Sequence, residues 1–465
     1  MRLTSSFKIL LVEDNAESRA AAEDELQRQF PDAQIDWAGD LESAKSILAS
    51  RSVDLAVCDL KIPARPGELT TSEANGLAVV SLLQEQHPGT PIIILSAYGT
   101  MENTEPYTAA AEVLSAYGVP DLRMCQAANK GNPAAFESRL RPIKEGLASL
   151  EAVDFEAPED LDHTLMCSIA QFAAVRGFSQ AEVTKAGGLS GSANAIVALR
   201  ATGRPIMRVF AKANDRHWLL DELHRQREFV EGYLDASNFA HTIETLRAGL
   251  RDKAAYFSSL ASDPMTLFQL AAVDEARATA ALERLESAAA PWKMNETRGL
   301  SVGALRRLHA SDEELASRGV FLDEFAELEE LELPFRFDVT HGDLHGENVL
   351  VVDDSRPVMV DFAYTEVAPG VLDPVTLEMS FLFHPESPLA NLAGVEIDGW
   401  ATGLYAPGSR FEAVLTRCRH WALKECGADQ FNAMSYAHAM RHVKRGIPVD
   451  QVLALARSSA RALGF

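Results

Sequence analysis

The first 150 residues contain five short segments that are almost continuously apolar, separated by segments with helical spacing. We predict strands over residues 7–12, 35–38, 53–58, 91–95 and 122–127, and helices over residues 16–29, 40–50 and 133–150. Strands that are apolar on both sides are typical of a parallel sheet with helices on both faces. The sequence therefore predicts an α/β fold with five strand–helix repeats, a doubly wound (βα)5 arrangement.

Polar side chains follow the predicted strands at the points where the strands end. Glu13 and Asp14 follow the first strand, Asp59 follows the third, and Ser96 and Lys130 follow the fourth and fifth. In a parallel sheet, ligands gather at the carboxyl ends of the strands. Carboxylate oxygens suit Mg²⁺, and an aspartate can accept a phosphoryl group covalently. We therefore predict that Glu13, Asp14 and Asp59 bind a metal ion, that Asp59 is the phosphoacceptor, and that Ser96 and Lys130 stabilise the phosphoryl oxygens.

A second chemical pattern lies near the carboxyl end, where residues 341–350 read HGDLHGENVL and Asp361 follows a predicted turn at 353–357. An enzyme that transfers a phosphoryl group from ATP mainly positions its reactants and stabilises charge with metal ions. We predict that Asp343 is the base or orients the acceptor hydroxyl, and that Asn348 and Asp361 bind Mg²⁺. His341 is expected to brace this loop by hydrogen bonding.

Nucleotide-binding residues are expected between the two patterns. Backbone amides of a glycine-rich segment would cover the phosphates, and the candidates are Gly187, Gly188, Ser190, Gly191 and Ser192. Lys212, at the end of a predicted strand over residues 206–212, is the preferred phosphate-binding cation, with Arg208 as the alternative. Its acidic partner is expected on the next helix, where Glu228 is preferred over Glu222.

The amino-terminal pattern resembles the receiver domain of two-component response regulators over about residues 5–150. The matching segments are LVED at 11–14, VCDL at 57–60, ILSA at 94–97 and Asn129-Lys130. The resemblance implies a flavodoxin-like fold and phosphorylation of Asp59 by a histidine kinase, with Mg²⁺ required. Ala127 stands where the family usually has an aromatic switch residue. Signalling through a Tyr or Phe rotamer is therefore not expected.

The carboxyl-terminal pattern resembles the aminoglycoside phosphotransferase and choline kinase group, which has a bilobal, protein-kinase-like α+β fold. The match is concentrated in residues 341–374, where Asp373-Pro374 also fits. The resemblance implies that ATP and Mg²⁺ are used to phosphorylate a hydroxyl acceptor, either a small molecule or a protein. Acidic surroundings would suit a cationic acceptor.

These patterns divide the chain into an α/β receiver domain over residues 1–150, an acidic linker over 151–160 and a kinase-like domain over 161–465. Within the last domain we expect an amino lobe over about 161–235 and a helical carboxy lobe over about 236–465. Helices are expected to dominate residues 217–332 and to continue from 375 onward.

Charge excludes several classes of partner. The chain has a net charge of −24, divided as −8 over the first 150 residues and −16 over the rest. Neither part is basic, so we expect no nucleic-acid partner. The basic residues Arg441, His442, Lys444 and Arg445 are interpreted as a solvated face. No apolar run has the length of a membrane span, so no membrane partner and a cytoplasmic location are expected.

Two functions remain open. The first is a response regulator whose output module is an ATP-dependent phosphotransferase. The alternative is a receiver fused to a catalytically silent kinase-like module that binds a protein.

Overall fold

The computed structural model describes residues 7–96, 104–186, 192–260, 264–389, 397–403 and 411–465. The chain divides into two compact units. The first comprises Met1–Leu219 with Thr242–Ser259, and the second comprises Leu220–His241 with Leu260–Phe465.

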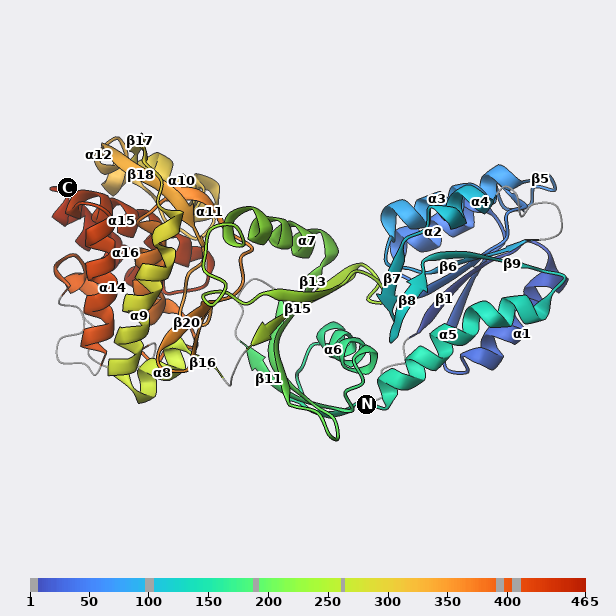
Figure 1. Cartoon of the computed structure of the whole chain (residues 1–465). Coiled ribbons are helices and arrows are strands. Elements are labelled where there is room, and N and C mark those ends of the chain that lie inside the picture. Colours follow the sequence, from blue (N-terminus) through green and yellow to red (C-terminus); the bar gives the residue numbers. More distant parts are fainter. Residues whose placement is uncertain (1–6, 97–103, 187–191, 261–263, 390–396, 404–410) are drawn as a thin grey trace. The chain divides into compact units, whose positions relative to one another are not determined.

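A five-stranded parallel sheet forms the first part of the chain (Figure 1). Its strands are β1 (Lys8–Val12), β2 (Gln34–Ala38), β3 (Leu55–Cys58), β6 (Ile92–Ser96) and β9 (Cys125–Asn129). The longer helices around it are α1 (Ala16–Gln29), α2 (Leu41–Ser50), α3 (Glu73–Gln86) and α5 (Pro133–Glu151). The strand order β2-β1-β3-β6-β9 is that of flavodoxin-like, doubly wound folds, which confirms the predicted fold class.

The sequence of β1 shows why helices cover both faces of this sheet. Ile9 and Leu11 belong to the core that contains residues of α1 and α5, whereas Leu10 and Val12 belong to the core that contains residues of α2 and α3. Successive strand residues point to opposite faces, so a strand buried on both sides must be apolar throughout. Figure 1 shows α1 and α5 on one side of the sheet and α2 and α3 on the other.

The strand predicted over residues 122–127 is wrong in its bounds. The chain there changes from β8 (Val119–Arg123), which pairs antiparallel with β7 (Val113–Ala116), to β9, which begins at Cys125. Tyr117 and Gly118, with φ of 51° and 79°, form the turn of the β7–β8 hairpin. Leu122, Met124 and Ala128 are all buried in one core, so the apolar pattern continues across the break and hides it.

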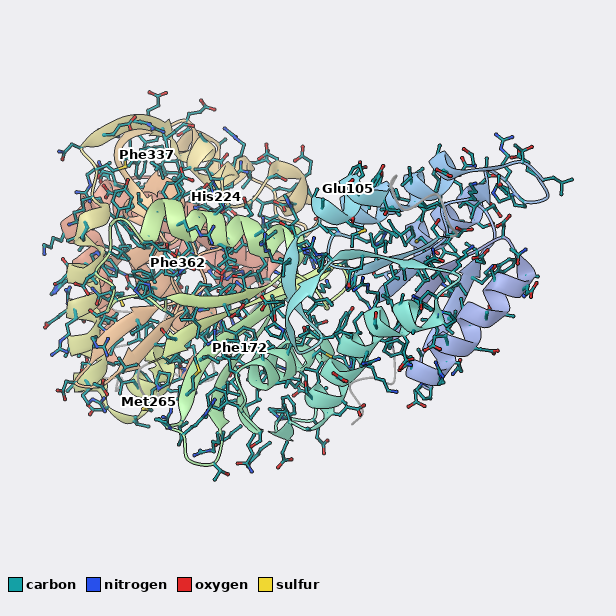
Figure 2. The ribbon with its side chains drawn as sticks, turned by 45° about the vertical axis from the view of Figure 1, so that its right-hand side comes forward. Glu105, Phe172, His224, Met265, Phe337 and Phe362 are labelled. Carbon is teal, nitrogen blue, oxygen red and sulfur yellow. The ribbon has the colours of Figure 1, made fainter. Side chains whose placement is uncertain are left out.

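A six-stranded sheet also belongs to the first unit, except for its residue Leu260, which belongs to the second unit. Its order is β10-β11-β12-β13-β15-β14. The strands are β10 (Asp154–Glu156), β11 (Gln180–Ala186), β12 (Ala193–Arg200), β13 (Met207–Asp215), β14 (Thr242–Leu246) and β15 (Lys253–Leu260). Phe172 of α6 (His163–Val175), labelled in Figure 2, stacks on Phe257 with ring centroids 4.1 Å apart. The segment 151–160 thus contains the end of α5 and all of β10 rather than only irregular chain.

Helices outnumber strands in residues 217–332, as expected, but the expectation missed the strands of this segment. β14, β15 and β17 (Glu296–Ser301) lie in this segment, and the six-stranded sheet extends to Leu260, beyond the expected lobe boundary near 235. Lys253–Leu260 reads KAAYFSSL and is buried at six of its eight positions. A strand buried on both faces has no polar alternation, and its alanines favour a helical interpretation.

The second unit is mainly helical. Its principal helices are α8 (Leu267–Val273), α9 (Glu275–Ala289), α13 (Leu372–Phe383), α14 (Glu412–Glu425), α15 (Ala428–Lys444) and α16 (Val449–Ala462). The helical pattern predicted from residue 375 onward is therefore confirmed. Two three-stranded sheets have the orders β16-β19-β20 and β17-β18-β21. Their remaining strands are β16 (Met265–Thr266), β18 (Glu332–Thr340), β19 (Val349–Val352), β20 (Arg356–Met359) and β21 (Glu366–Pro369). Among the described residues, no helix combines the length and the apolar character that crossing a membrane requires.

Candidate functional sites

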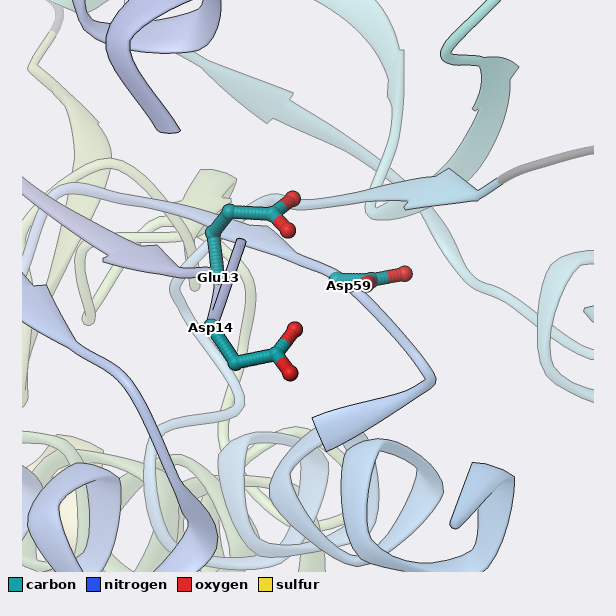
Figure 3. A group of neighbouring side chains, drawn as sticks. All are labelled: Glu13, Asp14 and Asp59. Carbon is teal, nitrogen blue, oxygen red and sulfur yellow. The ribbon is translucent and has the colours of Figure 1, made fainter. Parts of the chain in front are cut away.

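Three carboxylates meet at the carboxyl edge of the five-stranded sheet (Figure 3). Glu13 and Asp14 follow β1, and Asp59 follows the adjacent strand β3. One ligand oxygen from each of the three residues lies within 4.8 Å of the others. Glu13 and Asp59 are buried, whereas Asp14 is exposed. The three predicted metal ligands are therefore together, with one of them open to solvent.

Lys130 connects two of these carboxylates. Its Nζ lies 2.6 Å from Oε2 of Glu13 and 2.7 Å from Oδ2 of Asp59. Ser96 ends the neighbouring strand β6, and its carbonyl oxygen accepts a hydrogen bond of 2.9 Å from the backbone N–H of Lys130. The other oxygen of Asp59, Oδ1, accepts a bond of 2.7 Å from the N–H of Leu60.

The charges of this site favour a divalent cation. Burial raises the pKa of Glu13, against the opposing effect of its hydrogen bond with Lys130. Burial acts to lower the pKa of Lys130, but its hydrogen bonds to Asp59 and Glu13 outweigh this and raise that pKa. One ammonium cannot balance three carboxylates, and a hard cation with oxygen ligands is the group that such a donor set fits.

The HGDLHGEN segment of the second unit follows β18 and forms a braced loop. The side chain of Asp373 accepts hydrogen bonds of 2.7 Å from the N–H of His341 and 3.0 Å from the N–H of Gly342. His341 is fully buried, and its Nε2 donates to the carbonyl oxygen of Val360 at 3.0 Å. His341 therefore braces the loop, as expected from the sequence.

Asn348 immediately precedes β19, and Asp361 lies two residues beyond the end of its partner strand β20. The N–H of Val360 donates to the carbonyl oxygen of Asn348 at 3.1 Å, so Asp361 is one residue beyond the position opposite Asn348. Nδ2 of Asn348 donates to the carbonyl oxygen of Asp343 at 2.9 Å, which orients its Oδ1 as the atom that can bind a metal. Asp361 has φ of 67°, an unusual conformation for a residue with a side chain, and such strain is often found at functional sites.

The carboxylate of Asp343 is held by two arginines. Its Oδ1 accepts hydrogen bonds from Nη2 of Arg441 at 2.9 Å and from Nη2 of Arg445 at 3.3 Å. Burial acts to raise the pKa of Asp343, but Arg441, His345 and Arg445 together hold that pKa well below its ordinary range. The interpretation of this basic cluster as a solvated face is therefore wrong for Arg441 and Arg445. Their spacing of four residues places them on one side of a helix, which is the signal that the sequence offered.

The predicted nucleotide-binding residues fall in several places. Gly187, Gly188, Ser190 and Gly191 lie outside the described residues, and Ser192 accepts a bond of 3.2 Å from Asn214. Lys212 lies in β13 opposite Asn194 and is fully buried, whereas Arg208 is half-buried.

The two acidic partners considered for Lys212 differ in burial. Glu222 of α7 (Arg216–Arg225) is buried, whereas the side chain of Glu228 is 54% exposed and lies 3.5 Å from His224. A buried ammonium needs a buried countercharge. The choice between Glu222 and Glu228 as its partner stays a prediction.

Substituting Gly342→Ala should damage the braced loop. Gly342 has φ of 76°, and a Cβ there would lie 2.2 Å from the carbonyl oxygen of Tyr364. We expect the free energy of unfolding to fall by about 3 kcal/mol, from the left-handed backbone and the clash together. Gly319→Ala is the matched control, because Gly319 has φ of 77° with open space around it. This control substitution should lower the free energy of unfolding by only about 1 kcal/mol. If urea denaturation showed the same loss of unfolding free energy in both variants, the structure would have relaxed to relieve the contact with Tyr364.

Two families match the chain. Residues 9–113 match the response regulator receiver domain, and residues 188–407 match the phosphotransferase enzyme family. Over 98 residues the chain is 30% identical to the response regulator protein PilR of Pseudomonas aeruginosa, a match that covers 21% of this chain. It spans only 20% of the length of that relative.

Solved structures show similarities to both parts. A response regulator receiver domain protein from Clostridium thermocellum has 16% identity and a TM-score of 0.22, covering 30% of this chain and 95% of that chain. The response regulator TrrA from Thermotoga maritima has 20% identity and a TM-score of 0.22, and the match covers 30% of this chain and 98% of that chain. Aminoglycoside phosphotransferase APH(4)-Ia has 13% identity and a TM-score of 0.37, and the match covers 64% of this chain and 97% of that chain. With both families matched, the chain joins a response regulator receiver domain to a domain of the phosphotransferase enzyme family.

Proposed function

We propose that this chain is a phosphorelay response regulator whose output is an ATP-dependent phosphotransferase acting on a hydroxyl acceptor. The observation that carries this proposal is the contact of Lys130 with both Glu13 and Asp59, because it places an ammonium beside the proposed nucleophile and beside a proposed metal ligand. The partner proposed for the receiver is a histidine kinase, and the cofactors are Mg²⁺ and ATP.

In the receiver, Asp59 is the proposed acceptor. An oxygen of its carboxylate attacks the phosphorus of the phosphohistidine, the P–N bond breaks, and the imidazole of the kinase, which takes a proton from water on its other ring nitrogen, leaves as a neutral ring. Lys130 and Ser96 stabilise the phosphoryl oxygens. Glu13, Asp14 and Asp59 would hold Mg²⁺, and the ion would supply positive charge that offsets the charge of the phosphoryl group.

In the phosphotransferase domain, Asn348 and Asp361 are the proposed Mg²⁺ ligands, and Lys212 with the segment 187–192 is proposed to bind the nucleotide phosphates. Asp343 is proposed to contact the acceptor hydroxyl. Because the pKa of Asp343 is held so low, this carboxylate is suited to orienting the hydroxyl as an ionised acceptor of its hydrogen bond rather than to retaining its proton.

Hydrogen bonds within the first unit connect the receiver to the six-stranded sheet. Arg251 pairs with Asp54 through two bonds, Nε to Oδ1 at 2.9 Å and Nη2 to Oδ2 at 2.8 Å. The N–H of Tyr117, in the β7–β8 turn, donates to Gln171 at 2.8 Å, and Gln171 donates to the carbonyl oxygen of Gly249 at 3.0 Å. Asp54 immediately precedes β3, and Asp59 immediately follows it. We propose that these hydrogen bonds transmit the effect of phosphorylation at Asp59 from the receiver to the six-stranded sheet.

Substituting Arg251→Ala should weaken this contact. Asp54 would lose two charge-assisted hydrogen bonds while remaining buried, so we expect the free energy of unfolding to fall by about 2 kcal/mol. Phosphorylation at Asp59 should persist, but its effect on phosphotransferase activity should be lost. Lys253→Ala is the control, because it breaks an exposed ion pair with Asp215 near the same turn and should cost less than about 1 kcal/mol. Regulation that persists in the Arg251 variant would contradict the proposed route.

Two assays on the purified chain test the proposed function. One measures incorporation of phosphate from acetyl phosphate in the presence of Mg²⁺, and the other measures binding and hydrolysis of Mg·ATP. We expect both to be positive. A chain that neither accepts phosphate nor binds nucleotide would contradict the proposal.

A catalytically silent binding module is the second candidate for the carboxyl-terminal domain. The observation that favours it is that Arg441 and Arg445 both donate hydrogen bonds to Oδ1 of Asp343, so this oxygen already has partners within the protein. In that case Mg·ATP hydrolysis should be at background, whereas binding of a protein partner should not depend on Asp343.

A further inference from the structure

Two arginines contact the single carboxylate of Asp343. Two guanidinium groups, from Arg441 and Arg445, share one oxygen of one carboxylate. Desolvation and the proximity of Arg441 lower the pKa of Arg445, against the attraction of Asp343. Each guanidinium has five N–H donors, and a single carboxylate oxygen uses only one from each. The remaining donors suit a second anion.

Unpartnered imidazoles lie beside these arginines. In the part of the chain that the structure describes, neither ring nitrogen of His442 has a hydrogen-bond partner, nor does Nδ1 of His438 or Nε2 of His384. All three residues are at least 95% buried. Burial holds the pKa of each well below its usual value, with Arg445 adding to the effect at all three, so the rings are neutral. A neutral imidazole still offers one N–H donor, and buried donors are rarely left without a partner.

These imidazoles belong to two pairs of neighbouring rings. The rings of His438 and His442 have centroids 5.4 Å apart, and His384 lies 4.7 Å from His345 by the same measure. His345 in turn places Nε2 3.8 Å from Oδ2 of Asp343. Lys444 pairs instead with Glu314 at 3.1 Å.

We propose that the hydroxyl acceptor of the phosphotransferase domain carries an anionic group, a carboxylate or a phosphate, which Arg441 and Arg445 bind beside Asp343. This inference rests on the proposed function and specifies its substrate class. The arginines pair with the oxygens of the anion through parallel N–H donors, and the neutral imidazoles supply further hydrogen bonds. A polycationic acceptor such as an aminoglycoside would meet like charge at this position. The cationic acceptor suggested by overall composition is therefore disfavoured by the local charges.

Equilibrium binding to the full-length protein tests this inference. Isothermal titration, with saturating Mg²⁺ and a non-hydrolysable ATP analogue, compares four small hydroxyl compounds: glycerate, glycerol 3-phosphate, glycerol and ethanolamine. The bound analogue keeps the probes out of the nucleotide site. We expect glycerate or glycerol 3-phosphate to bind at least about tenfold more tightly than glycerol, and ethanolamine to bind no better than glycerol. The first two probes distinguish a carboxylate site from a phosphate site.

Variants assign the binding to the arginines. Arg441→Gln combined with Arg445→Gln should weaken binding of the anionic probe by about tenfold to a hundredfold. The matched control is Lys444→Gln, which removes one positive charge from the same helix and should leave probe affinity unchanged. Binding of the ATP analogue should persist in both variants, which verifies that they are folded.

Three results would overturn the inference: ethanolamine as the tightest ligand, anionic probes that bind no better than glycerol, or anion binding that is unchanged in the double variant. The same titrations report on the proposed function separately. If the ATP analogue does not bind but the anionic probes bind through Arg441 and Arg445, the phosphotransferase proposal fails and the anion site stands.

Discussion

Substituting Asp59→Asn should reduce phosphorylation of the receiver to background. The carboxamide is not a nucleophile for phosphorus, and the change also removes the negative charge of one of the three carboxylates proposed to bind Mg²⁺. Lys130 would keep its contact with Glu13 at 2.6 Å, so the local fold should persist. Incorporation of radiolabelled phosphate from acetyl phosphate, followed by its release at alkaline pH, measures the acyl phosphate directly.

The control is Asp36→Asn. Asp36 lies in β2 of the same sheet, and its carboxylate accepts hydrogen bonds from Arg51 at 3.1 and 3.2 Å. It is away from the carboxyl edge, so labelling should match the wild type. Labelling that survives in the Asp59 variant would place the phosphoryl group on another residue and would remove the receiver half of the proposal.

The receiver site was predictable because it depends on short stretches of sequence and one general rule. Glu13, Asp14, Asp59 and Lys130 each follow an apolar strand, and parallel strands bring their carboxyl ends to one edge. Neither the length of the intervening loops nor their conformation was needed for the prediction. The β7–β8 hairpin was missed because Leu122, Met124 and Ala128 are buried in one core on both sides of the break.

The surroundings of Asp343 were less predictable. Arg441 and Arg445 are about a hundred residues away in the chain, and nothing in the local pattern distinguishes charges facing a catalytic loop from charges facing water. The large buried fraction of α15, where Tyr436 and Met440 are fully buried, places this helix within the domain. Only tertiary packing brings its basic residues to the carboxylate. Sequence also could not rank Glu222 against Glu228, because the two differ in burial rather than in chemistry.

Substituting Asp343→Asn should lower the rate of phosphoryl transfer by about a thousandfold, within the range expected for loss of a catalytic acid–base group. The carboxamide retains an oxygen that can accept from Arg441, so the local packing should persist, but it cannot orient a hydroxyl as an anionic acceptor. Asn348 and Asp361 are unchanged, so the affinity for a non-hydrolysable Mg·ATP analogue should stay within about threefold. Release of ADP from Mg·ATP, with and without glycerate or glycerol 3-phosphate, measures the effect.

Asp353→Asn is the matched control for this change, because Asp353 is an exposed carboxylate in the β19–β20 turn that lies 3.5 Å from Arg356. Its activity should equal that of the wild type. A rate that is unchanged in the Asp343 variant would exclude the proposed role of this carboxylate. A loss of rate with nucleotide affinity intact separates orientation of the acceptor from binding of the metal and nucleotide, and it therefore favours an enzyme over a silent binding module.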